Sequence, residues 1–215
     1  FNDTVTLANF RSLAAALLAS ADDHVLAYLK ERLTELIGAD PGRATEVLGW
    51  VRDATPKEAG VFLSALRGSE AVQQPEVAAR LRAMSFDPTL AAERRAGLLS
   101  ALDTQKQFAP AVLGQLANLA RDPSSGEAGW AATRTIGRVM ATDFQRTGNV
   151  APYLEKLLAI GSEAKDDDIR YLALSLPMHA DPILDTRAIA AYARILTTEG
   201  SANGEDVSWL SASIS

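Results

Sequence analysis

Two segments of the chain place aromatic, basic and hydroxyl side chains at a spacing that suits recognition of a partner. The residues in each segment are four apart: Trp130, Arg134 and Arg138 in the first, and Tyr171, Ser175 and His179 in the second. Side chains four apart lie one turn apart on the same face of a helix. Because aromatic and arginine side chains dominate binding hot spots, these six residues form a predicted protein- or peptide-binding surface. The alternative is that Trp130 and Tyr171 pack between helices, while the arginines are solvated or cap helix ends.

The remaining polar groups predict no catalytic centre. Asp166, Asp167 and Asp168 follow Glu163, and such oxygens can bind a divalent cation, but the spacing of an EF-hand loop is absent. We expect this run to begin a helix, where negative charge suits the helix dipole. His24 falls near a helix start and has no catalytic partner in sequence. We therefore expect no catalytic residue, no metal and no cofactor.

Composition excludes several classes of protein. The chain has 215 residues, no cysteine and two histidines, which rules out thiolate zinc sites, iron–sulfur clusters and multi-histidine metal sites. Its net charge of −6 and pI near 5.0 argue against nucleic acid as a partner, because such binding requires clustered Lys and Arg. No apolar run approaches the roughly 18 residues that a membrane span needs.

The pattern along the chain predicts helices almost throughout. Ala, Leu, Arg and Glu favour helices, and β-branched residues never alternate over the length of a strand. Several prolines fall in the first turn of an apolar-periodic segment, where the missing N–H costs nothing. The expected helices are 6–20, 22–37, 41–53, 56–67, 75–84, 88–103, 109–121, 126–141, 150–160, 166–178 and 184–198.

A pattern of small and apolar residues recurs in alternate helices. Four eleven-residue segments align without gaps, and they begin at Glu58, Arg94, Ala128 and Ile169, which are 34 to 41 residues apart. A helix pair with such a stripe buries it by stacking on the next pair. Segments 131–137 (AATRTIG) and 169–177 (IRYLALSLP) resemble the HEAT/armadillo-like α-solenoid family, over roughly residues 41–198.

That resemblance implies an all-α, right-handed α-solenoid of about five helical-hairpin repeats; a compact irregular helical bundle is the alternative. We expect one domain over 1–198, with 1–40 as an N-terminal capping pair and 199–215 as a flexible polar tail. The predicted function is a non-enzymatic protein- or peptide-binding scaffold that uses its concave surface. An enzyme or small-ligand binder on the same scaffold, or a structural domain of a longer polypeptide, remains open. The Ala-rich composition, with more Arg than Lys, is typical of bacterial proteins, either cytoplasmic or exported after loss of a signal or anchor.

Overall fold

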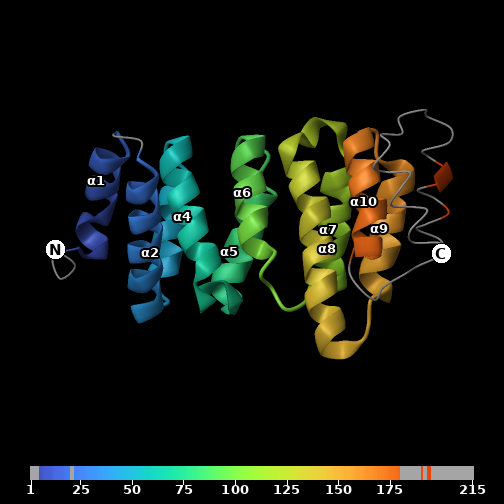
Figure 1. The fold of residues 1–215 in the computed structure, drawn as a ribbon, viewed down its shortest axis with the longest axis horizontal. Coiled ribbons are helices and arrows are strands. Elements are labelled where there is room, and N and C mark those ends of the chain that lie inside the picture. Colours follow the sequence, from blue (N-terminus) through green and yellow to red (C-terminus); the bar gives the residue numbers. More distant parts are fainter. Residues whose placement is uncertain (1–4, 20–21, 180–189, 191–192, 195–215) are drawn as a thin grey trace. The chain divides into compact units, whose positions relative to one another are not determined.

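The computed structural model describes residues 5–19, 22–179, 190 and 193–194. Within these residues the chain contains helices, turns and loops but no strand, which confirms the all-α prediction for this part (Figure 1). Most of the expected helix 184–198 and the whole tail 199–215 lie outside the described residues. Among the helices described, none combines the length and the apolar character that crossing a bilayer requires.

Contacts divide the chain into two compact units, Phe1–Lys106 and Gln107–Ser215, and each is described by itself. The first unit contains α1 (Leu7–Leu18), α2 (Asp23–Ala39), α3 (Arg43–Val51), α4 (Pro56–Gly68), the 3-10 helix η2 (Glu70–Gln73), α5 (Pro75–Ser85) and α6 (Ala92–Leu102). The second contains α7 (Pro110–Arg121), the 3-10 helix η3 (Pro123–Ser125), α8 (Glu127–Thr147), α9 (Ala151–Glu163) and α10 (Asp167–His179). The expectation of one domain over 1–198 stays a prediction.

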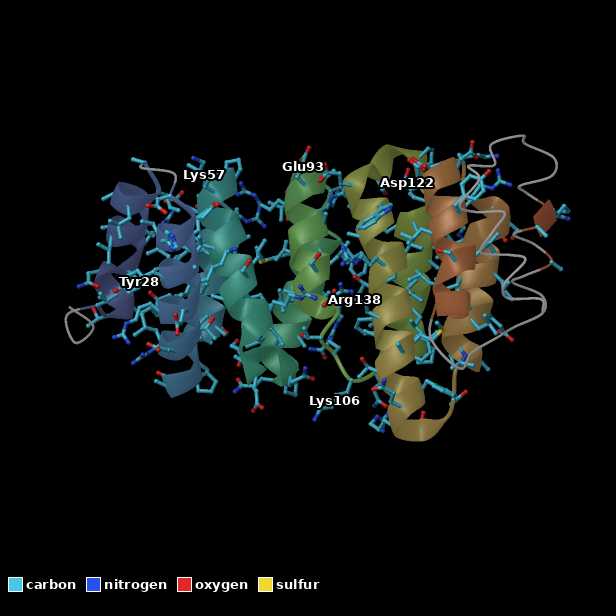
Figure 2. All side chains as sticks on the ribbon, viewed as in Figure 1. Tyr28, Lys57, Glu93, Lys106, Asp122 and Arg138 are labelled. Carbon is cyan, nitrogen blue, oxygen red and sulfur yellow. The ribbon has the colours of Figure 1, made fainter. Side chains whose placement is uncertain are left out.

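In the first unit, alternate helices lie side by side. Helix α4 contacts α2 on one side and α6 on the other, and α5 packs against both α3 and α6 (Figure 1). Helices α4 and α6 run in the same direction, since Lys57 and Glu93 stand at the same end of the pair (Figure 2). At the other end, Arg67 Nε lies 3.1 Å from Asp103 Oδ1. The core between them includes Leu63, whose Cδ1 would lie 2.6 Å from a Cβ placed on Gly97.

The second unit repeats this arrangement. Helix α8 contacts α10, α7 contacts α9, and each pair of consecutive helices also packs together. The α8–α10 contact is close because glycines line it: a Cβ on Gly129 would lie 3.0 Å from Ile169 Cδ1, and one on Gly137 would lie 2.7 Å from Leu176 Cδ1. Since both contacts advance in the same direction along the chain, α8 and α10 are parallel.

Arginines at the ends of helices join alternate helices. Arg52 pairs with Asp87 at 2.8 Å between the ends of α3 and α5, and Arg121 pairs with Glu163 between the ends of α7 and α9. Together with Arg67–Asp103, these pairs span 35, 36 and 42 residues. Ion pairs near the surface contribute only about 0–1 kcal/mol each, so their role here is chiefly to hold helix register.

One arginine holds the end of a helix that lies far from it in sequence. The guanidinium of Arg94, on α6, donates to the carbonyls of Val51, Arg52 and Ala54 at 2.5, 2.5 and 2.6 Å. These carbonyls belong to the end of α3 and the turn after it, where no intrahelical donor remains. Arg94 therefore completes the hydrogen bonding of α3.

Most expected helix boundaries lie within three residues of the structure, and two differ further. The expected helix 88–103 begins only at Ala92, because Asp87 Oδ1 accepts hydrogen bonds from the N–H and hydroxyl of Thr89 and forms a turn first. The expected helix 126–141 continues to Thr147 and ends at Gly148, which adopts φ 72°. The segment between the expected helices 126–141 and 150–160 is therefore helical over most of its length, and the prediction of a connection there was wrong.

Candidate binding surface on helices α8 and α10

Helix α8 presents an aromatic side chain to solvent beneath an arginine. Trp130 is 41% exposed and is the one large hydrophobic residue classed as exposed in the described part of the chain. The guanidinium carbon of Arg134, one turn further along, lies 5.4 Å from the centre of the Trp130 ring. This is the distance of a cation–π contact. The predicted four-residue spacing thus brings these two side chains into contact.

The next turn of α8 adds a second cation. Arg138 is partly exposed and lies alongside the middle of the helix (Figure 2). Because Trp130, Arg134 and Arg138 are each four apart, the three side chains follow one stripe of α8. Glu127 is exposed on the first turn of the same stripe. Along α8 the aromatic ring therefore stands between one carboxylate and two guanidinium groups.

Helix α10 supplies the second set of predicted residues. Tyr171 and Ser175 are both partly exposed, and the hydroxyl of Ser175 donates to the carbonyl of Leu172 at 2.9 Å. His179 is the last residue of α10, but its side chain lies outside what the structure describes.

The packing of α8 on α10 fixes how the two sets align along the helices. Gly129 faces Ile169 and Gly137 faces Leu176, an offset of about 40 residues that agrees with the predicted alignment of 128 with 169. Trp130 and Tyr171 are therefore at similar heights on neighbouring parallel helices. We call Trp130, Arg134, Arg138, Tyr171 and Ser175 the α8–α10 surface; that these side chains act together stays a prediction.

The acidic run before α10 has a capping arrangement. Asp166 Oδ1 accepts from the backbone N–H of Ile169 at 3.1 Å, and Asp167 pairs with Arg170 at 3.1 Å. Such hydrogen bonds satisfy N–H groups that the first turn of a helix leaves open. Among the described residues no group of three or more His, Cys, Asp or Glu side chains is placed to hold a metal ion.

Comparison with known proteins assigns no family. No family model, no curated protein and no solved structure matches the chain. The α8–α10 surface is therefore judged on its own geometry and chemistry.

Sequence reasoning missed a polar cluster elsewhere in the second unit, in which Tyr153 and Asp143 are buried. The Tyr153 hydroxyl donates to Asp143 Oδ2 at 2.8 Å and accepts from the backbone N–H of Phe108 at 3.3 Å. Arg146 donates to Asp143 Oδ1 and to Gln107 Oε1, both at 2.6 Å. Burial, followed by the hydrogen bond to Asp143, raises the pKa of Tyr153 to about 12. The cluster anchors the segment before α7 to α8 and α9.

The sequence contained only a weak signal for that cluster. Tyr153 lies in the expected helix 150–160, among the apolar residues Leu154, Leu157 and Leu158, and it is 2% exposed. Asp143 lies between the expected helices 126–141 and 150–160, where the sequence predicts no buried partner for the Tyr153 hydroxyl. A buried tyrosine normally satisfies its O–H group, and that rule is the signal that could have led to Asp143.

The first unit contains an apolar groove. It lies between the N-terminal halves of α4 and α6 and has a volume of about 290 Å³. Its lining residues are Pro56, Ala59, Gly60, Leu63, Ala91, Glu93, Arg94 and Gly97. The hollow arises because small residues occupy both helices there, and a Cβ on Gly60 would meet nothing within 4 Å. The guanidinium of Arg94 already donates to three backbone carbonyls. A ligand in the groove would therefore be held by apolar contacts rather than by hydrogen bonds from Arg94.

Proposed function

We propose that the chain is a non-enzymatic scaffold that binds a protein or peptide on the α8–α10 surface. The observation that supports this most is the exposed Trp130 ring in contact with Arg134. Leaving a large apolar ring in water forgoes the stabilisation that its burial would give. Tryptophan and arginine are also the residues most enriched among binding hot spots.

The close packing of α8 on α10 and on the core favours a binding site that is already formed before the partner arrives. Gly129 and Gly137 allow α10 to approach α8 closely, and buried residues such as Ile136 and Met140 fill the inner side of α8. Side chains on packed helices lose little further freedom on binding, which reduces the entropic cost of association. A partner would thus meet an aromatic ring and two arginines at fixed spacing.

The scaffold that we propose is a right-handed α-solenoid of about five helix pairs. Its support is the side-by-side packing of alternate helices within each unit and the three arginine–carboxylate pairs, which span 35, 36 and 42 residues. Those spans resemble the period of 34 to 41 residues in the sequence. Each helix pair then buries the apolar stripe of its neighbour, as in repeat proteins.

The test is to compare wild type with Trp130→Ala and with the control Tyr28→Ala, which removes a partly exposed aromatic side chain from the first unit. Proteins retained from a cell extract by wild type and Tyr28→Ala, but not by Trp130→Ala, are then purified. Isothermal titration calorimetry should give a Kd weakened by roughly tenfold or more for Trp130→Ala, as for a hot-spot residue. The proposal is contradicted if no protein shows this dependence on Trp130, or if the measured affinity is unchanged, with the helical circular dichroism of the variants intact.

A further inference from the structure

We propose that the partner of the α8–α10 surface is an acidic peptide segment whose carboxylate pairs with Arg134 while an adjacent apolar side chain packs on Trp130. This inference rests on the proposed function and specifies the chemistry of the partner.

The first argument is that Arg134 has no carboxylate partner among the described residues. Three other arginines of the second unit have carboxylate partners: Arg121 with Glu163, Arg146 with Asp143 and Arg170 with Asp167. Within the described residues, the contact of Arg134 is with the Trp130 ring, and it makes no hydrogen bond or ion pair. A cation–π contact does not use the N–H groups of a guanidinium as hydrogen-bond donors, and two of these groups can bind the two oxygens of one carboxylate.

The second argument is that the ring and the cation form one composite site. Contact with Trp130 limits the rotamers of Arg134, so less side-chain entropy is lost when a carboxylate binds. Trp130 is also 41% exposed, so an apolar side chain beside the bound carboxylate can pack on its ring. A segment that places an acidic residue beside an apolar one satisfies both groups at once.

The third argument is the order of charges along α8. Glu127 lies before Trp130 in the stripe, whereas Arg134 and Arg138 lie after it. A bound segment is thus expected to place its acidic residue at Arg134 and away from Glu127. The net charge of −6 does not oppose this, because fields from distant surface charges are screened beyond about 8 Å at physiological salt.

Nucleic acid fits this surface less well than an acidic peptide. Binding a phosphate backbone requires a track of basic side chains that displaces several counterions. Here the stripe carries two arginines and an exposed carboxylate at Glu127, and α10 begins with exposed Asp167 and Asp168. These carboxylates would repel successive phosphates, while a short peptide can avoid them.

The experiment selects peptides from a random 12-residue display library on the full chain. Wild type is compared with Arg134→Glu and with Arg80→Glu, a control that makes the same change of net charge at an exposed arginine of α5. We expect Asp or Glu next to an apolar residue to be enriched on wild type and Arg80→Glu. On Arg134→Glu the preference should shift to Lys or Arg.

A quantitative arm follows with the best acidic peptide and its amide counterpart, in which each Asp or Glu is replaced by Asn or Gln. Fluorescence anisotropy should give an acidic peptide bound about fivefold more tightly to wild type, as expected for one partly exposed ion pair. Arg134→Gln should abolish that difference, whereas Trp130→Ala should weaken both peptides. Circular dichroism checks that each variant is folded.

The outcomes separate this inference from the proposed function. Peptides that need Trp130 but show no acidic enrichment, or equal affinity of the acidic and amide peptides, would overturn the inference and leave the binding surface standing. If no selected peptide depends on Trp130, both are overturned. If Arg134→Glu still selects acidic peptides, the peptide carboxylate pairs with a group other than Arg134, and the inference is also overturned.

Discussion

Two glycines in the second unit should respond differently to the same substitution. Gly161, in α9, lies under Leu174 of α10: a Cβ there would be 2.5 Å from both Cδ2 and Cγ of that leucine. Gly114, in α7, would have nothing within 4 Å of its Cβ. Since real side-chain carbons do not approach to 2.5 Å, Gly161→Ala must displace Leu174 or the helix that carries it.

The expected size follows from two opposing effects. Replacing glycine by alanine inside a helix stabilises the fold by about 1 kcal/mol through propensity alone, which is the expectation for Gly114→Ala. Overpacking costs typically about 1–3 kcal/mol, so Gly161→Ala should lie between neutral and roughly 2 kcal/mol destabilising. For a chain of this length, 1 kcal/mol corresponds to a shift in Tm of about 2–4 °C.

The measurement is differential scanning calorimetry, with urea unfolding followed by far-ultraviolet circular dichroism as a second probe. Gly114→Ala should raise Tm, and Gly161→Ala should melt below Gly114→Ala by several degrees. Equal increases in Tm for the two variants would refute the reasoning, because they would mean that Leu174 leaves room for a methyl group at Gly161.

Two further substitutions test hydrogen bonds of titratable groups. Tyr153→Phe should destabilise the fold by about 1–3 kcal/mol in urea, because the buried N–H of Phe108 loses its partner and Asp143 loses a donor. Since the pKa of Tyr153 is raised to about 12, its contribution is complete below pH 10 and is lost between pH 10 and 12; wild type should therefore lose more stability over that window than Tyr153→Phe, and parallel curves would contradict this. Hydrogen bonds from Thr89 and from Arg52 lower the pKa of Asp87 to about 2, so its contribution is present above pH 4 and lost toward pH 2. Asp87→Asn should therefore flatten the acid limb of a thermal stability profile, and an unchanged limb would count against the role of Asp87.

The elements that sequence predicted best are those with a local chemical signal. The helix expected at 56–67 is found at Pro56–Gly68, because Pro56 suits the first turn and Thr55 and Glu58 cap each other. The backbone N–H of Thr55 holds the pKa of Glu58 below its usual value for the same reason. The residues that make up such a signal lie within four positions of one another, so the signal can be recognised from the sequence alone.

The features that sequence could not predict depend on distant groups. The segment 142–147 looks like a loop, with its polar residues before Gly148, yet it is helical because Asp143 is buried against Tyr153 and Arg146. In the candidate site, the contact of Trp130 with Arg134 followed from spacing alone. That Arg134 forms no ion pair with any described carboxylate did not follow from the sequence, because it depends on which residues pack around α8.

The three carbonyls held by Arg94 have a consequence for a chain made from its N-terminus. The acceptors are at residues 51, 52 and 54, and their donor is synthesised some 40 residues later. During translation, the last turn of α3 must share its carbonyls with water until α6 has left the ribosome. The C-terminal end of α3 is therefore completed only after three further α-helices have been made.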